Sequence, residues 1–233
     1  MADLLSYSID NKVAVLQMDD GKANALSREM IDAITAALAR AETEATAAVL
    51  VGRPDRFCAG FDLRVMMSGP DNAKDLLKAG SAMLMKLYGS AIPVVVACTG
   101  HALAGGALVV LTGDFRVCAA GAYRIGLNEV SIGLPVPVLA MELARDRLSK
   151  RSLVQATLLS HIYDPDGALR AGFVDDVVPS DQVLDRAKAE AARLGGLPRT
   201  AFNATKQRLR GKTIEYITST LDADMRAMTV PTS

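Results

Sequence analysis

The stretch Thr99-Gly100-His101-Ala102-Leu103-Ala104-Gly105-Gly106-Ala107-Leu108 decides how the rest of the sequence is interpreted. It joins the wholly apolar run Val94–Cys98, typical of a strand covered on both faces, to an apolar helical pattern at 107–112. Small residues at such a turn let a ligand approach the backbone, and the first amides of a helix have no acceptor inside the helix. The turn is therefore a candidate anion site, although glycine-rich turns more often only solve a packing problem.

A second segment, Phe57-Cys58-Ala59-Gly60-Phe61-Asp62-Leu63, shows the same order of an apolar strand end, small residues and a helical start. If both turns face one cavity, one N–H from each forms an oxyanion hole, where losing a single donor typically costs about 2.7–4 kcal/mol of barrier. The chain has no GxGxxG after its first strand and no GxxxxGK[ST], so the sequence supports neither a dinucleotide nor a nucleotide-phosphate cradle.

Strands and helices alternate outward from these two turns. Residues 6–9 and Val13–Met18 predict a hairpin around Asp10-Asn11, and Ser27 is the expected cap of the helix that follows. The further elements predicted are strands at Ala47–Val51, Val94–Cys98, Phe115–Ala119 and 174–178, and a helix at 73–87. This alternation indicates an α/β fold in which helices pack on a layered sheet.

The last part of the chain has a different character. Residues 182–233 contain helical patterns and no convincing strand. No internal repeat, low-complexity run or block of charge separates them from the residues before them. We therefore expect a core at residues 1–181 and a C-terminal helical segment at 182–233, which is not an independent domain and serves in oligomerisation and in covering the functional site.

Composition limits the classes of function. The chain has 233 residues, 50% of them hydrophobic, which is enough for one buried core. Lys plus Arg (26) equals Asp plus Glu (26), so the charge favours neither nucleic acid nor an anionic membrane as partner. Three widely spaced cysteines and two histidines indicate a reducing compartment and no metal site. Because neither a secretory signal nor an apolar run of roughly 20 residues is found, we expect a cytoplasmic protein that acts on a small molecule.

Three spaced motifs resemble the enoyl-CoA hydratase/isomerase (crotonase) family. Two are the turns above, in the family's order, and the third is Ile125-Gly126-Leu127-Asn128-Glu129-Val130-Ser131-Ile132-Gly133, similar to the family's glutamate-bearing loop. Asn24-Ala25-Leu26 resembles the family's adenine-side loop. The resemblance implies a crotonase-like spiral of ββα units with C-terminal helices, and an acyl-CoA thioester as substrate. It also implies no cofactor beyond the CoA of the substrate, and a homotrimer or dimer of trimers.

The resemblance also assigns roles to single residues. It implies that the Phe61 and Gly105 amides hold the thioester oxygen, and that Glu129 moves the proton. The substrate contacts that it implies are Lys22, Ala23 and Ala25 near the CoA nucleotide, and Ala59, Asp62, Leu63, Arg64 and Leu108 along the ligand. Lys206 and Arg210 are candidate contacts of the CoA phosphates. The segment Gly133-Leu134-Pro135-Val136-Pro137-Val138 departs from the family's glycine-rich pattern and must reshape the acyl pocket, because proline removes amide donors.

A single carboxylate favours the isomerase branch of this family. Members that hydrate efficiently carry a glutamate three residues after the second oxyanion glycine, where this chain has Leu108, which cannot bind or deprotonate water. Glu129 lies among apolar neighbours, which should raise its pKa by partial desolvation. We expect an isomerase that shifts the double bond of a 3-enoyl-CoA to carbon 2 through a dienolate, in fatty-acid oxidation. The alternatives are an enoyl-CoA hydratase that relies on Glu129 alone, and a catalytically inactive acyl-CoA binder.

Several of these residues also have simpler explanations. Glu129 would otherwise be a surface or capping glutamate, and Leu108 would serve only helix packing. Asp62 is more plausible as a helix cap than as a reacting group. A lone histidine in a turn of small residues, such as His101, is more often structural than catalytic. Cys58 has no nearby histidine in sequence to activate it, so we treat it as a small apolar residue.

Overall fold

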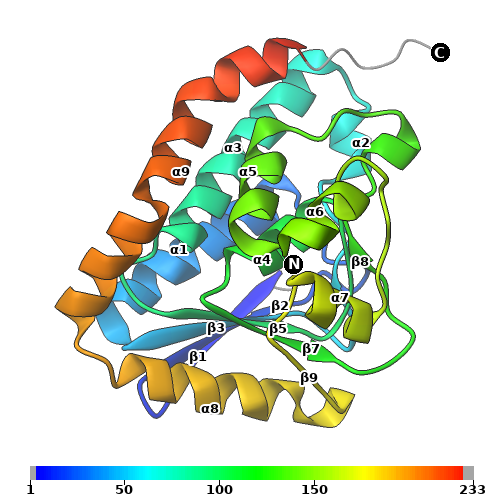
Figure 1. The fold of residues 1–233 in the computed structure, drawn as a ribbon. Coiled ribbons are helices and arrows are strands. Elements are labelled where there is room, and N and C mark those ends of the chain that lie inside the picture. The colour runs from blue at the N-terminus through cyan, green and yellow to red at the C-terminus, as the bar shows by residue number, and fades with distance from the viewer. Residues whose placement is uncertain (1–3, 228–233) are drawn as a thin grey trace.

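The computed structural model describes residues 4–227, which form two sheets and the helices around them (Figure 1). The larger sheet has six strands in the order β1-β2-β3-β5-β7-β9. Its edge is the predicted hairpin of β1 (Leu5–Asp10) and β2 (Val13–Met18), with Asn11 and Lys12 at positive φ in the two-residue turn. Positive φ at both central residues is the turn geometry whose twist matches that of the paired strands.

The other strands of this sheet run parallel to β2. They are β3 (Ala47–Val51), β5 (Val94–Cys98), β7 (Phe115–Ala119) and β9 (Asp176–Val178). Every residue of β3 and β5 is buried, which explains why both read as continuous apolar runs rather than as alternating patterns. The bounds predicted for the first three of these strands are confirmed.

Helices cover both faces of the larger sheet (Figure 1). On one face lie α1 (Arg28–Glu44), capped by Ser27 as predicted, and α3 (Pro70–Tyr88). On the other lies α8 (Val183–Gly195), whose buried side chains form one apolar cluster with valines of β2, β3 and β5. The long α9 (Arg199–Ala227) packs along α3 and α5 (Val138–Arg147). Both C-terminal helices therefore bury apolar surface against the rest of the chain.

The sequence does not predict the smaller sheet. Its strands are β4 (Asp55–Cys58), β6 (Gly100–Leu103) and β8 (Ile125–Gly126), paired in parallel in that order. The interpretation of the whole glycine-rich stretch after β5 as a turn is therefore wrong for β6. These strands are too short for a periodic pattern, and their extended conformation comes from pairing between segments distant in sequence. The sheet leads directly into two helices, α2 (Leu63–Met66) and α4 (Gly105–Thr112).

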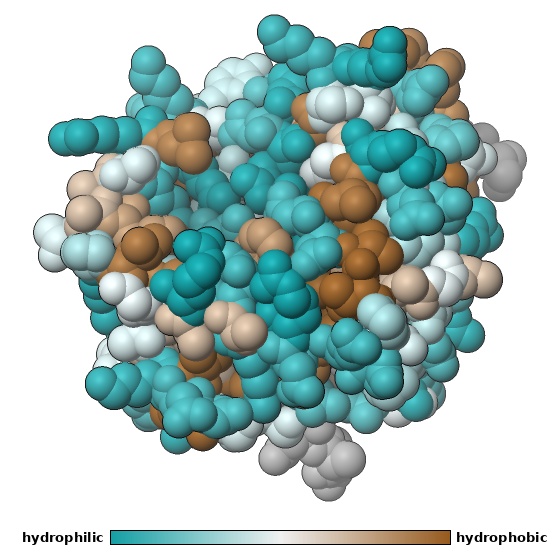
Figure 2. Space-filling model, turned by 60° about the horizontal axis from the view of Figure 1, so that its bottom comes forward, coloured by the Kyte–Doolittle hydropathy of each residue, from teal (hydrophilic) through white to brown (hydrophobic). Residues whose placement is uncertain are grey.

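Two short helices complete the described residues, α6 (Lys150–Ala156) and α7 (Pro165–Ala171), together with single 3-10 turns at Val130–Ile132 and Ser180–Gln182. Figure 2, in which the lower side of Figure 1 comes forward, shows apolar residues as separate patches among polar ones. Of the helices described, none combines the length and apolar character that crossing a bilayer requires. The sequence predicts no helix or strand for residues 229–233, and this tail lies outside the described residues.

Candidate active site

The two predicted turns lie against each other. A Cβ added to Gly60, which has φ +98°, would lie 3.1 Å from the Leu103 carbonyl oxygen and 3.2 Å from the Gly105 nitrogen. A Cβ added to Gly106 would lie 2.1 Å from the carbonyl oxygen of Cys58. Because both contacts are with backbone, no side chain can move aside to relieve them. Glycine at these two positions therefore allows the turn after β4 to touch the turn after β6.

Each turn leaves one amide free. The Leu26 amide donates to the Gly60 oxygen (2.8 Å), and the Asp62 amide donates to the Leu26 oxygen (3.3 Å). These two hydrogen bonds pair Leu26 with Phe61 as a parallel β-bridge and leave the Phe61 N–H unused. Gly105 is the first residue of α4, so its N–H has no acceptor inside the helix. Among residues 4–227, neither the Phe61 nor the Gly105 amide donates to another protein group. The two N–H groups are thus available to an external oxygen.

Backbone strain marks the second turn. Ala104, immediately before Gly105, has φ 48° and ψ −121°, a conformation that side chains with a Cβ rarely adopt. Such residues cost about 1–3 kcal/mol and persist where the surrounding structure fixes them, typically at functional sites. Here the Ala104 amide donates to the Gly126 oxygen (3.0 Å), which fixes the turn against β8. The glycine-rich sequence gives no sign that the strained residue is the alanine.

The hydrogen bond between Ala104 and Gly126 also ties the segment that carries Glu129 to the second turn. Glu129 follows Gly126 by three residues, and Gly126 is both the pairing partner of Leu103 and the acceptor of the Ala104 amide. Its side chain is buried, with 8% of the residue exposed, and Oε2 has no hydrogen-bond partner among the described residues. Desolvation by this burial raises the pKa of the Glu129 carboxyl. A buried carboxylate oxygen without a donor is costly in a folded protein, and the Glu129 side chain does not cap the 3-10 turn that follows it.

Glu129→Gln is expected to increase thermal stability at neutral pH. Burial raises the pKa of the folded carboxyl above that of the unfolded chain, so stability is greatest below the unfolded pKa and falls as pH rises through the folded pKa. Glutamine never carries the charge. The melting temperature of the variant should exceed that of the wild type at pH 7, and the difference should vanish near pH 4, where the unfolded glutamate is about half protonated. An equal or lower melting temperature at pH 7 would show that the carboxylate is not desolvated.

The loop before α1 is organised by two residues for which no such role was predicted. Asn24 is fully buried, and its Nδ2 donates to carbonyl oxygens of β2 and β4, at 3.1 Å to Met18 and 3.2 Å to Phe57. The Asp20 carboxylate accepts the amides of Lys22 (2.7 Å) and Asn24 (2.9 Å). The Asp-Asp-Gly run at 19–21 could have predicted the role of Asp20, since aspartate commonly accepts the amide two residues further along the chain.

The residues expected near the CoA nucleotide belong to this loop. Lys22 is exposed, Ala23 and Ala25 are half-buried, and the Ala59 amide donates to the Ala23 oxygen (3.0 Å). The loop is thereby tied to the first oxyanion turn.

The remaining residues predicted to line the ligand differ in exposure. Asp62 caps α2, because its Oδ1 accepts the Arg64 amide at 2.8 Å, and this capping role is confirmed. Leu63 (68% exposed) and Arg64 project from α2 into solvent. Leu108 is buried in the main apolar cluster, so the first turn of α4 supplies no polar side chain at that position. The structure thus brings Phe61, Gly105 and Glu129 into connected backbone segments.

Comparison with known proteins decides the family. A family model described as enoyl-CoA hydratase/isomerase matches residues 8–233. The chain belongs to the enoyl-CoA hydratase/isomerase family. It is similar to human mitochondrial enoyl-CoA delta isomerase 1, with 32% identity over 219 residues that cover 92% of this chain and 72% of the human protein.

Solved structures agree with this assignment. A Mycobacterium tuberculosis protein described as an enoyl-CoA isomerase superposes with a TM-score of 0.92 at 38% identity, over 97% of this chain and 99% of that one. A second structure of the same protein, described as a probable enoyl-CoA hydratase, gives 0.91 at 40% identity over 94% of each chain. The two-sheet α/β architecture is therefore the crotonase fold predicted from the sequence.

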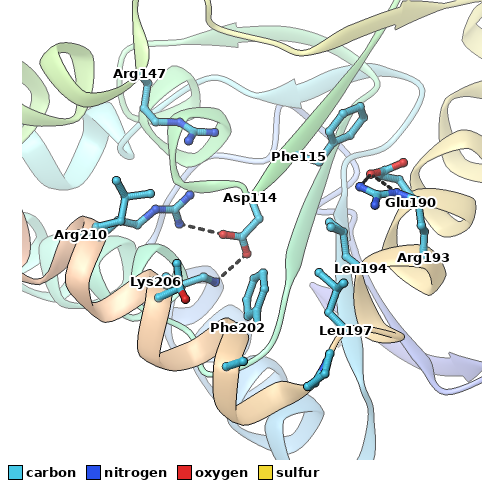
Figure 3. Close-up of a pocket in the computed structure, with 14 residues that line it drawn as sticks. Asp114, Phe115, Arg147, Glu190, Arg193, Leu194, Leu197, Phe202, Lys206 and Arg210 are labelled. Carbon is cyan, nitrogen blue, oxygen red and sulfur yellow. Dashed lines mark hydrogen bonds and ion pairs between the residues drawn. The ribbon is translucent and has the colours of Figure 1, made fainter.

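The prediction that Lys206 and Arg210 contact the CoA phosphates is wrong. Lys206 and Arg210 are not free to contact CoA phosphates, because both side chains are 4% exposed and pair with Asp114, at 2.6 Å and 3.0 Å. Figure 3 shows the three side chains converging at one side of a cavity of about 520 Å³. Asp114 follows the C-terminal end of α4, whereas Gly105 begins that helix. The two cations therefore anchor the far end of α4.

His101 and Cys58, which the sequence predicts to be structural rather than catalytic, are both held in structural positions. His101 Nδ1 accepts the Arg124 amide (3.1 Å), and its ring packs edge-on against Tyr123, so it is held in place by the segment that leads into β8. Cys58 is fully buried, and burial raises the pKa of its thiol to about 12. A thiol with that pKa is protonated at neutral pH and is a poor nucleophile.

Proposed function

We propose that this chain is an enoyl-CoA isomerase that converts a 3-enoyl-CoA to the 2-enoyl-CoA. The observation that carries the proposal is the buried, unpartnered carboxylate of Glu129, on the segment that pairs with the turn before Gly105. Leu108 is apolar where a hydratase needs a second glutamate. The acyl-CoA class of substrate follows from the family. The choice of isomerisation over hydration follows from one proton carrier and from the lack of a polar side chain at position 108.

The reaction balances with Glu129 alone. Its carboxylate removes a proton from carbon 2, and the electron pair of that C–H bond moves into the thioester carbonyl to give a dienolate. The Phe61 and Gly105 N–H groups donate to the oxygen on which the negative charge develops. The protonated Glu129 then returns the proton to carbon 4, the double bond forms between carbons 2 and 3, and the carboxylate is regenerated. No water enters or leaves.

The raised pKa of Glu129 suits both halves of this cycle. A carboxylate of ordinary pKa is a weak base toward a carbon acid, and desolvation makes it a stronger one. The Phe61 and Gly105 N–H groups stabilise the enolate oxygen and so lower the pKa of the substrate C–H bond, whereas desolvation raises the pKa of Glu129. Proton-transfer partners with closer pKa values exchange the proton more readily.

Leu108→Glu is expected to add hydratase activity. Residue 108 follows Gly105 by three positions on α4, so its side chain lies on the same helix face as that turn. A carboxylate there could hold and activate water at carbon 3 of a 2-enoyl-CoA. We expect 3-hydroxyacyl-CoA formation to rise at least tenfold above wild type, a change of about 1.4 kcal/mol in the barrier. The same variant with no gain in hydration, although folded and still binding CoA, would contradict the placement of Leu108.

Two alternatives to the isomerase stay open, and one of them has specific support. An enoyl-CoA hydratase is favoured by the Mycobacterium tuberculosis relative, which one of its structures describes as a probable enoyl-CoA hydratase. Comparing wild-type turnover of 2-enoyl-CoA and of 3-enoyl-CoA separates this alternative from the isomerase. An inactive acyl-CoA binder would bind CoA without exchanging a proton at carbon 2, and the buried unpartnered Glu129 argues against it. Assembly as a homotrimer or a dimer of trimers and a cytoplasmic location stay predictions.

A further inference from the structure

The ring of Phe61 fills a slot between α3 and the first residue of α4. A Cβ added to Gly80 of α3 would lie 2.2 Å from Cε1 and 2.6 Å from Cζ of that ring. A Cβ added to Gly105 would lie 3.0 Å from Cδ2 and 3.1 Å from Cε2, on the opposite ring edge. The ring therefore has one edge on each glycine and spans the gap between the two helices.

The slot is joined to the backbone that carries the oxyanion donors. Leu26, which is fully buried, makes the parallel bridge to Phe61, and its Cδ1 lies 3.2 Å from the Cβ position of Gly105. Side chains occupy a few discrete rotamers, so a ring that cannot enter the slot must change rotamer or carry the backbone with it. Where every other rotamer clashes with its surroundings, displacing the Phe61 ring displaces the Phe61 N–H relative to the Gly105 N–H.

A glycine in the interior of α3 is unfavourable for the helix, and the space taken by the Phe61 ring explains its presence. In a helix interior, glycine is less favourable than alanine, because it loses more conformational freedom on folding. Gly80 is buried and has ordinary helical φ, so neither solvent nor backbone geometry requires it. The ring of Phe61 is the neighbour that a side chain at position 80 would meet first.

From this geometry we infer that Gly80 is a positioning residue, whose missing side chain seats the Phe61 ring and thereby sets the separation of the two oxyanion donors. The inference rests on the proposed function, because it gives Gly80 a role in catalysis through the Phe61 amide. It treats residues 61 and 80 as a size-matched pair, in which a larger residue at one position requires a smaller residue at the other.

Gly80→Ala tests the pair. We expect kcat for a 3-enoyl-CoA to fall roughly 10- to 100-fold, because small misplacements of a reacting group cost up to about 10²-fold. The affinity for CoA alone, whose nucleotide would lie by the loop of residues 22–25, should change less than twofold. Gly211→Ala is the matched control, since a Cβ added to this glycine of α9 meets no atom within 4 Å. Adding Phe61→Leu to Gly80→Ala should recover part of the lost kcat by relieving the overlap.

Kinetics of G80A equal to those of G211A would overturn the inference. So would a folded F61L/G80A double variant that is no faster than G80A. Crystal structures of the wild type and these variants keep the inference testable if the wild type has no isomerase activity. In that event the proposed function fails. The inference survives only if the distance between the Phe61 and Gly105 nitrogens differs in G80A and returns toward the wild-type value in F61L/G80A.

Discussion

Glu129→Gln is expected to lower kcat for 3-enoyl-CoA isomerisation by about 10²–10⁴-fold, the range typical of losing a general acid–base. Glutamine keeps the size of the side chain but cannot accept a proton from carbon 2. KM should change little, because the amides of Phe61 and Gly105 and the CoA contacts remain. Steady-state kinetics with a 3-enoyl-CoA of medium chain length would measure both constants.

The control for this variant is Glu215→Gln, which removes an exposed carboxylate of α9 that has no ion pair among the described residues. Its kinetics should match the wild type. Turnover by folded E129Q within about threefold of the wild-type rate would remove Glu129 from the mechanism. A second buried carboxylate would then have to be the base.

Asp114→Ala is expected to destabilise the fold by about 3–5 kcal/mol, because it leaves two buried cations without their shared counter-ion. The Asp114 carboxylate also accepts the Val94 amide (2.8 Å), which begins β5. Burial lowers the pKa of Lys206 even with Asp114 present, so removing the carboxylate leaves the desolvation of this lysine uncompensated. For a chain of this size, the loss corresponds to a melting temperature lower by roughly 6–20 °C.

A surface ion pair gives the matched comparison for Asp114. Lys78 and Asp222 are also 2.6 Å apart, but both are exposed, and solvent screens the interaction. The melting temperature of Asp222→Ala should stay close to that of the wild type. If D114A and D222A melted at the same temperature, the buried network of Asp114, Lys206 and Arg210 would contribute nothing to stability. The position of α4 would then depend on other contacts.

The sequence predicts the larger sheet well and the smaller sheet not at all. The strands of the first, such as β3 and β5, bury both faces and read as apolar runs whose ends are visible in the sequence. β6 and β8 have four and two residues, and they are extended because β6 pairs with β4 on one side and with β8 on the other. Such pairing is a tertiary effect that local composition does not encode.

The site shows the same division. Motif resemblance predicts Glu129 and the two turns as the site. The structure adds the hydrogen bond from the strained Ala104 to Gly126, and those from Asn24 to β2 and β4. The wrong expectation for Lys206 and Arg210 came from treating basic residues of a C-terminal helix as ligand contacts. Their burial against Asp114 depends on how α9 packs over the end of α4, which spacing along the chain does not reveal.

Deuterium incorporation at carbon 2 of a saturated acyl-CoA in D₂O isolates the step that Glu129 and the two amides perform. This exchange requires the enolate and replacement of the proton on Glu129 by deuterium from the solvent, and it requires no proton transfer to carbon 4. We expect exchange at carbon 2 by the wild type and loss of that exchange in Glu129→Gln. Exchange at an unchanged rate in the variant would contradict the assignment of Glu129 as the base that forms an amide-stabilised enolate.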